Sequence, residues 1–171
     1  MHREHATLSS DLMPAIGHGH IDVKPNVAEL RGERIGFADG TEAPYDAVVY
    51  ATGYRTVFPF LSPGVFDPEA NLDDLYRRMV LPQHPRIVFS GLVQPIGPTI
   101  PLVEIQGKWI AAWLSGRMAL PAAAEMHAEA GAHAAERRRQ WLDAPRYALE
   151  VDFRSYAGKM QADMKAGAAG V

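Results

Sequence analysis

The chain of 171 residues contains no cysteine. It therefore has no disulfide, no thiol nucleophile and no thiolate ligand for a metal ion. It also lacks an excess of charge of either sign, because 17 Lys and Arg residues face 20 Asp and Glu residues and leave a net charge of −3. This balance gives no support for nucleic-acid binding, which needs a basic surface.

Long apolar runs are absent as well. The longest candidate for a membrane segment, residues 100–114, is interrupted by Glu104, Gln106 and Lys108 and is too short to span a bilayer. The first residues lack the apolar core of a signal peptide, so we expect neither a signal peptide nor a membrane segment. The lack of cysteine is compatible with a cytoplasmic protein, and 47% hydrophobic with 22% charged residues is an ordinary globular composition.

The most informative segment is Asp46-Ala-Val-Val-Tyr-Ala-Thr-Gly-Tyr54. Its apolar part, residues 47–51, holds no charge and predicts a strand buried on both faces, as in a parallel sheet. Thr52 and Gly53 would then mark the carboxyl end of the strand, where ligands bind in open α/β sheets. A second buried strand is predicted at residues 86–90 and ends in Gly91. We expect the two strands to be parallel neighbours or near-neighbours, with both glycines at one edge of the sheet.

The other predicted elements are an antiparallel meander and helices. Residues 1–19 read as loop with one helical turn near residues 8–13, and Asp39-Gly40 is a hairpin signal. Proline-rich residues 55–84 form a long connection. Short strands are expected at 21–23, 27–30 and 35–37, and helices at 99–115, from Pro121 to about Trp141, and around an apolar face of Phe153, Tyr156, Met160 and Met164.

Side chains that could carry chemistry by themselves do not form a known pattern. His18 and His20 would share one face of a strand, but no third ligand stands at a metal-site spacing. Ser90-Gly91 lacks the preceding glycine of a nucleophile elbow. The run Glu136-Arg-Arg-Arg139 is typical of a solvated helix face. We therefore expect no metal site and no catalytic side chain.

Several short segments follow one another along the chain in a recognisable order. They are Asp39-Gly40, Ala51-Thr-Gly-Tyr54 with Phe58-Pro-Phe-Leu61, Leu75-Tyr76, Pro85-Arg-Ile-Val-Phe-Ser-Gly-Leu-Val-Gln-Pro-Ile-Gly97, Glu104-Ile-Gln-Gly-Lys-Trp109 and Gly116-Arg-Met-Ala-Leu-Pro121. In these segments and their order the chain resembles the flavin-containing monooxygenases, from about Ser9 onward.

The two glycine-rich dinucleotide fingerprints of that family are missing. The nearest candidate, Gly17-His-Gly-His-Ile-Asp22, lacks the third glycine. The resemblance therefore implies the C-terminal portion of a monooxygenase, with Met1 an internal methionine or an artificial start. We predict an α/β fold, a partial FAD/NAD(P)-binding Rossmann-like fold of the two-dinucleotide-binding flavoproteins, with a small antiparallel meander, buried parallel-type strands and C-terminal helices. Its expected parts are a remnant of the NADPH-binding domain or a linker (1–24), the C-terminal part of the FAD-binding domain (25–120) and a helical extension (121–171).

The resemblance also implies chemistry. In this family NADPH reduces FAD, and the reduced flavin captures O₂ as a C4a-hydroperoxide that oxygenates a soft nucleophile such as an amine or a sulfide. The aromatic cluster of Phe58, Phe60 and Phe66 could line an apolar substrate path, although such a cluster is more often part of the core. The residues implied to contact FAD are Thr52, Gly53, Gly91, Leu92, Gln94 and Thr99, and those implied on the substrate or nicotinamide side are Tyr54, Phe58 and Phe60.

Other functions stay open at this point. A Baeyer–Villiger or an N-hydroxylating monooxygenase shares the flavin chemistry, and a stand-alone binding or assembly module would hold no cofactor, which a flavin absorption spectrum would decide. We expect the chain alone to be inactive, to expose an apolar patch where the N-terminal half of the protein would pack, and to have a small-molecule nucleophile and O₂ as partners, with a homo-oligomer left open.

Overall fold

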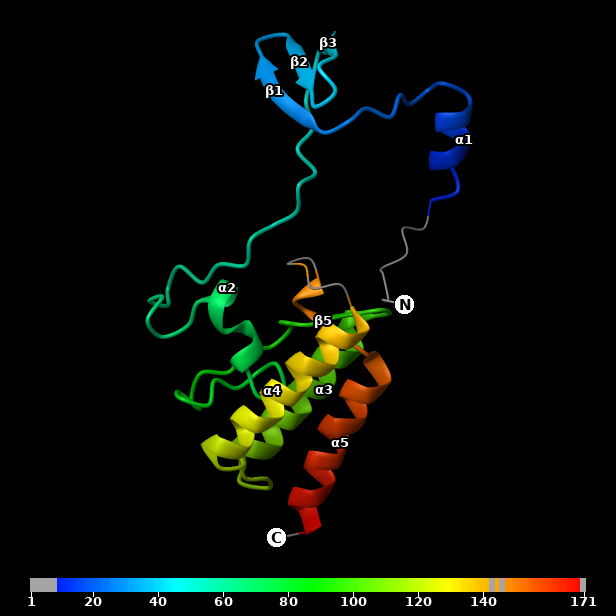
Figure 1. Cartoon of the computed structure of the whole chain (residues 1–171). Coiled ribbons are helices and arrows are strands. Elements are labelled where there is room, and N and C mark those ends of the chain that lie inside the picture. The colour runs from blue at the N-terminus through cyan, green and yellow to red at the C-terminus, as the bar shows by residue number, and fades with distance from the viewer. Residues whose placement is uncertain (1–8, 142–143, 145–146, 170–171) are drawn as a thin grey trace. The chain divides into compact units, whose positions relative to one another are not determined.

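The computed structural model describes residues 9–141, 144 and 147–169 (Figure 1). The chain divides into two compact units, and the boundary lies between Arg55 and Thr56. The fold is mixed α/β, with a small antiparallel sheet in the first unit and a parallel pair of short strands in the second. This agrees with part of the predicted fold class.

The first unit contains helix α1 (Leu12–Gly17) and a three-stranded sheet in the order β1-β2-β3. Its strands are β1 (Val27–Arg31), β2 (Arg34–Phe37) and β3 (Glu42–Pro44), all antiparallel, with Leu30 opposite Ile35 and Ile35 opposite Ala43. Gly32 and Gly40 stand in the turns between the strands, with φ of 59° and 83°. A residue with a side chain would be strained in this left-handed conformation. The predicted meander is confirmed at residues 27–30 and 35–37.

Other predictions for this unit are wrong. Residues 21–23 form no strand, β3 was not anticipated, and the helix begins at Leu12 rather than near residue 8. The predicted buried strand at 47–51 is instead extended chain without strand pairing, and all of its residues are exposed, with Val49 87% exposed. An apolar run becomes a buried strand only where neighbouring strands satisfy its backbone groups. Among the described residues, nothing pairs with this run.

The second predicted strand, 86–90, is also wrong. It makes one isolated bridge, between Val88 and Val80, and Ser90 is exposed. The parallel pair of this unit is β4 (Gln94–Pro95) with β5 (Glu150–Val151). Within the described residues, no sheet contains Gly53 or Gly91, so the predicted shared sheet edge does not exist in this structure.

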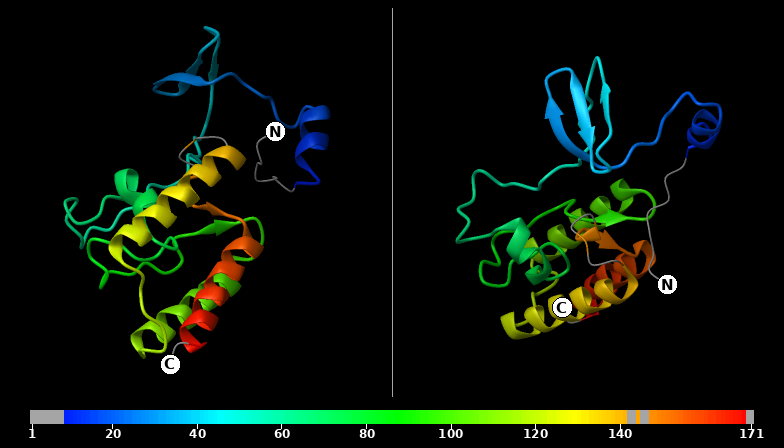
Figure 2. Two further views of the ribbon diagram at one scale, coloured as in Figure 1. Left: turned by 60° about the horizontal axis from the view of Figure 1, so that its bottom comes forward. Right: turned by 45° about the horizontal axis from the view of Figure 1, so that its top comes forward.

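Helices dominate the second unit. They are α2 (Pro68–Asn71) with the 3-10 turn η1 (Leu72–Asp74), α3 (Thr99–Leu114), α4 (Ala123–Gln140) and α5 (Phe153–Ala169). The helices α3, α4 and α5 confirm the three that were predicted from the sequence. Figures 1 and 2 show α3 and α5 running side by side. Glu104 and Lys108, one helical turn apart on α3, form an ion pair at 2.6 Å, and Gly116 follows α3 with a φ of 74°.

Two hydrophobic clusters make the core of this unit. The first packs α3 against α5 and includes Leu102, Trp109 and Met160, none of them more than 1% exposed. The second cluster consists of Phe66, Leu75, Leu81, Phe89 and Leu92. Tyr156 and Met160 of α5 are buried and Phe153 and Met164 pack at the edge, which confirms the predicted apolar face of this helix.

Replacing Gly158 or Gly167 of α5 with alanine should change the free energy of unfolding in opposite directions. A Cβ at Gly167 would lie 2.8 Å from the Arg117 carbonyl oxygen, whereas one at Gly158 would meet nothing within 4 Å. Gly158→Ala should raise the free energy of unfolding by about 0.5–1 kcal/mol through helix propensity. Gly167→Ala should lower it, because backbone must move to remove the overlap. Urea unfolding of both variants checks the signs, and a stabilised Gly167→Ala protein would contradict the packing of α5 on residues 117–118.

The exposed run 48–50 predicts self-association. Val48, Val49 and Tyr50 are contiguous, apolar and unpaired, which favours edge-to-edge contacts between copies. Light scattering should show a mass that rises with concentration, and Val49→Lys should suppress the rise. Val23→Lys is the matched control, because Val23 is also exposed but stands between Asp22 and Lys24. A monodisperse monomer that binds no hydrophobic dye would contradict this expectation.

Candidate functional site

An apolar cavity of about 450 Å³ lies beside Gly91, between the segments 56–61 and 87–92. Its volume falls in the range of about 300–1,000 Å³ that small-molecule sites occupy. The ring of Phe58 lies 5.0 Å from that of Phe89, which in turn lies 4.4 Å from Phe66. Phe58 and Phe89 line the cavity, and Phe66 packs against Phe89 without lining it. Its lining residues are Thr56, Phe58, Phe60, Leu61, Ile87, Val88, Phe89, Ser90, Gly91 and Leu92.

Gly91 has a left-handed backbone, with a φ of 84°. A Cβ there would lie 3.7 Å from Val103, an ordinary contact, so the backbone conformation and not crowding is what favours glycine. The Gly91 N–H donates to Oε1 of Gln106 on α3 at 2.8 Å. The cavity wall is thus attached to the buried side of α3.

The buried Gln106 is part of a chain of hydrogen bonds. Its Nε2 donates to the hydroxyl oxygen of Tyr156 on α5 at 2.7 Å, and that hydroxyl donates to the carbonyl oxygen of Arg77 at 2.7 Å. Burial raises the pKa of Tyr156 to about 12, so the hydroxyl keeps its proton and remains a donor at neutral pH. One line of hydrogen bonds therefore joins Gly91, α3, α5 and Arg77.

Both the backbone carbonyl and the side chain of Arg77 make hydrogen bonds to other elements. Its guanidinium donates to both carboxylate oxygens of Asp163, at 2.7 and 2.8 Å, and to Glu129 at 2.6 Å. Trp109 Nε1 donates to the same Asp163 at 3.1 Å. Burial alone would lower the pKa of Arg77, but the hydrogen bond to Asp163 and the two carboxylate charges raise it above its usual value. This guanidinium therefore stays charged and ties α4 to α5.

Arg78 is the most deeply buried cation of this unit's described residues, at 2% exposure. It donates to the Leu72 carbonyl at 2.8 Å and to Asp73 at 3.2 Å. Asp73 also accepts from Arg137 and Arg138 of α4. Burial raises the pKa of Asp73, but these arginines outweigh burial and hold that pKa below its usual value. Arg77 and Arg78 both have positive φ, 52° and 56°, which such residues rarely adopt. Their ion pairs hold this turn in place.

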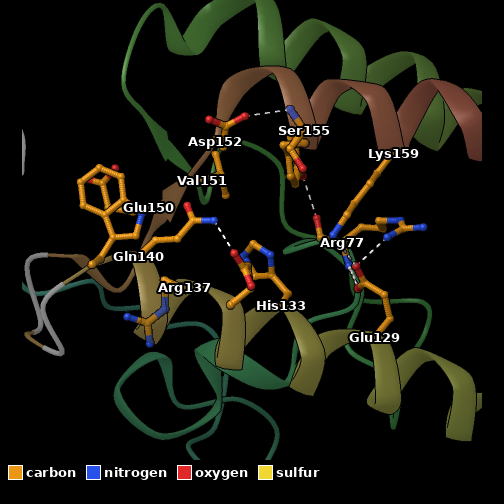
Figure 3. A pocket seen from close by; sticks show the side chains of 13 residues that line it. Arg77, Glu129, His133, Arg137, Gln140, Glu150, Val151, Asp152, Ser155 and Lys159 are labelled. Carbon is orange, nitrogen blue, oxygen red and sulfur yellow. Dashed lines mark hydrogen bonds and ion pairs between the residues drawn. The ribbon is translucent and has the colours of Figure 1, made fainter. Parts of the chain in front are cut away.

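A second cavity, of about 300 Å³, lies between α4 and the start of α5 (Figure 3). Arg77 and Glu129 stand at one end of it, and Gln140 and Glu150 at the other. His133 projects into its middle, where burial, followed by the charge of Arg78, lowers its pKa to about 4. The lining carries charges of both signs, so it selects no particular charge of ligand.

The predicted site residues fall into three groups. The structure brings Phe58, Phe60, Gly91 and Leu92 together on the apolar cavity, with Phe60 80% exposed and Leu92 buried. Gln94 and Thr99 do not line it. Gln94 is exposed in β4, where its N–H donates to the Leu149 carbonyl at 2.7 Å, and Thr99 is the first residue of α3.

Thr52, Gly53 and Tyr54 belong to the other compact unit. Gly53 has a φ of 85°, and Tyr54 is fully exposed. The three residues stand on the extended chain after the predicted strand, and their relation to the cavity stays a prediction.

Sequence reasoning missed the residues that hold the cavity wall. Gln106 lay inside the segment Glu104 to Trp109 that carried the family resemblance, but no function was attached to it. A signal was present, because Gln106 stands four residues after Leu102 on the face that α3 buries. Arg77 and Arg78 gave no local signal. Across the described residues, no group of three or more potential metal ligands gathers, and no helix there is long and apolar enough to cross a membrane.

Known proteins are similar to this chain in sequence and in structure. Residues 1–168 match the family described as flavin-binding monooxygenase-like. Flavin-containing monooxygenase 5 of Rattus norvegicus is 34% identical over 153 residues, which are 88% of this chain and 28% of that relative. Dimethylaniline monooxygenase (N-oxide-forming) 2 of Oryctolagus cuniculus is 39% identical over 125 residues, 71% of this chain and 23% of that relative.

A solved structure, that of S-allyl-L-cysteine S-oxygenase from Allium sativum, matches with a TM-score of 0.64 and 27% identity. The match covers 81% of this chain and 33% of that protein. The chain thus spans about a quarter to a third of the length of these relatives. Since the family match extends over residues 1–168, this chain belongs to the flavin-binding monooxygenase-like family.

Proposed function

We propose that the chain works as one portion of a longer FAD- and NADPH-dependent monooxygenase and supplies one wall of its flavin site. The observation that carries this proposal is the apolar cavity of about 450 Å³ lined in part by residues 90–92, in a chain of a flavin-binding family. The remainder of the protein would cover the exposed apolar residues 48–50 and provide the dinucleotide fingerprints.

The cavity fits one part of FAD, the flat isoalloxazine ring. Phe58, Phe60 and Phe89 offer apolar surface to such a ring, while the backbone at Gly91 lies on the same wall. The diphosphate of FAD needs a glycine-rich loop at a helix N-terminus. The sequence contains no such fingerprint. The residues therefore suit the ring and not the phosphates.

The chain's own residues would orient the ring and keep water away from it. When bound, the flavin supplies the redox chemistry, accepting reducing equivalents from NADPH and activating O₂. The phenylalanine rings exclude water from that chemistry. The N-cap of α3 is Pro98, which caps no N–H with its side chain, so the N–H groups of Thr99 and Ile100 would be available to stabilise negative charge on the bound flavin. Gln94 would hydrogen-bond the polar edge of the ring, with Thr52 and Gly53 close to the flavin and Tyr54 towards nicotinamide or substrate.

The substrate class follows from the relatives' chemistry. One relative is named for forming an N-oxide and another for S-oxygenation of S-allyl-L-cysteine. Amine nitrogen and sulfide sulfur are both soft nucleophiles, so we infer that the intact protein oxygenates an amine or a sulfide. The test is NADPH-dependent formation of an N-oxide from N,N-dimethylaniline or an S-oxide from S-allyl-L-cysteine by the full-length protein. An intact protein that carries no flavin would refute the proposal.

The missing fingerprints predict how tightly the chain alone binds different flavins. Without a phosphate loop, FAD and riboflavin should bind about equally and weakly, since they differ only in groups for which this chain has no recognisable site. Fluorescence titration of the 171-residue chain with each flavin measures both dissociation constants. FAD bound more than about tenfold tighter than riboflavin, equivalent to about 1.4 kcal/mol, would show that the chain recognises the diphosphate or adenosine after all.

Replacing Gln94 tests the polar edge of the ring in the full-length protein. Gln94→Leu should leave the fold intact, because the side chain is exposed and β4 pairs through its backbone. It should remove a hydrogen bond worth about 1 kcal/mol and shift the flavin midpoint potential, with the affinity for NADPH little changed. Gln83→Leu, at another exposed position of the same unit, is the control. An unchanged potential and an unchanged ratio of product formed to NADPH consumed would show that the Gln94 side chain does not contact the flavin.

A further inference from the structure

The amide of Gln106 has a defined orientation. Its side chain is fully buried, its oxygen accepts from the Gly91 N–H at 2.8 Å, and its nitrogen donates to Tyr156 at 2.7 Å. The reversed amide would place a donor against the Gly91 N–H, so only one orientation satisfies both neighbours. The Tyr156 hydroxyl donates its proton to the Arg77 carbonyl oxygen, so each hydrogen bond in the chain has one defined donor and one defined acceptor.

Packing alone does not require glutamine at this position. Leu102 and Trp109 stand four residues before and three residues after Gln106 on the buried face of α3, and an apolar side chain of the same length would fill the space without burying polar atoms. A fully satisfied buried network instead selects one arrangement of the groups it joins. Here the selected group is the peptide between Ser90 and Gly91, on the wall of the apolar cavity.

Fixing that N–H fixes the opposite side of the same peptide. In a trans peptide the C=O and N–H point in opposite directions, and the structure contains no cis peptide among its described bonds. With the Gly91 N–H turned toward Gln106, the Ser90 carbonyl points away from α3. Without the acceptor, the glycine at φ of 84° could rotate this peptide at low cost.

We propose that Gln106 is a positioning residue for the flavin, which acts by locking the Ser90–Gly91 peptide, and that Tyr156 keeps the Gln106 amide in the working orientation. This inference rests on the proposed function, because it takes the cavity beside Gly91 as the flavin site. Gln106 itself does not line that cavity, so its effect on the flavin passes through the peptide.

The first experiment measures the peptide. Gln106→Met removes the hydrogen bonds to Gly91 and Tyr156, together with a longer one from the Ser90 hydroxyl at 3.5 Å, and keeps an unbranched side chain of similar length. In the 171-residue chain, amide hydrogen exchange at Gly91 should become about tenfold faster, the factor that an ordinary hydrogen bond supplies. Tyr156→Phe removes a single oxygen atom and should produce a smaller increase. Gln140→Met, which loses only a bond to Glu136 on the surface of α4, is the matched control and should leave this amide unchanged.

The second experiment measures the flavin in the full-length protein. Gln106→Met and Tyr156→Phe should shift its midpoint potential with the same sign, the methionine variant more strongly, while Gln140→Met keeps the original potential. A purely structural role would lower the thermal midpoint of the variants and leave the potential of the folded protein unchanged. If Gln106→Met does not fold, Tyr156→Phe decides, because it changes the network at almost constant packing.

The possible failures are distinguishable. An unmodified full-length protein without flavin overturns the proposed function. A flavin-loaded protein whose potential is the same in both network variants overturns the positioning role of Gln106 and leaves the proposed function standing. Unchanged exchange at Gly91 in Gln106→Met overturns the lock itself.

Discussion

The buried amide of Gln106 is the connection on which the second unit depends. Through it the loop at Gly91, helix α3 and helix α5 share one line of hydrogen bonds that ends on the Arg77 carbonyl. The Arg77 guanidinium then joins α5 to α4 through Asp163 and Glu129. Because Gln106 and Tyr156 are buried, the loss of either side chain's polar group leaves the other without water or protein to bond it. The hydrophobic clusters supply most of the burial, and the polar line fixes how the helices and the cavity wall meet.

The helices of this unit could be predicted from the sequence because their signals are local. Leu102, Trp109 and Trp113 repeat with helical spacing, Gly116 ends the helix, and Met160 belongs to a similar repeat in α5. The hairpin at Asp39-Gly40 is local in the same sense, since the Asp39 carboxylate accepts from the Thr41 N–H at 3.0 Å within the turn. Such features need no information from distant residues.

Features that depend on distant partners could not be predicted. Residues 47–51 have the composition of a buried strand, but composition does not say whether neighbouring strands are present, and in this structure the run is exposed. The left-handed turn at Arg77 and Arg78 is maintained by Asp163, Glu129 and Asp73, none of which is recognisable from the local sequence. The candidate site divides in the same way. Its glycine and phenylalanines were identified by a motif, while the glutamine that orients the glycine emerged only with the contacts.

The separation of these partners along the chain has a consequence for the order in which the protein can fold during synthesis. Arg77 and Asp163 are 86 residues apart, and Arg77 and Tyr156 are 79 apart. A chain made from its N-terminus therefore completes the loops at residues 77–92 and helix α3 well before the residues that hold them exist. Contacts this distant are slow to form, because a long loop must close first. The wall of the apolar cavity consequently reaches its final form only when α5, which is made after α3 and α4, docks against α3.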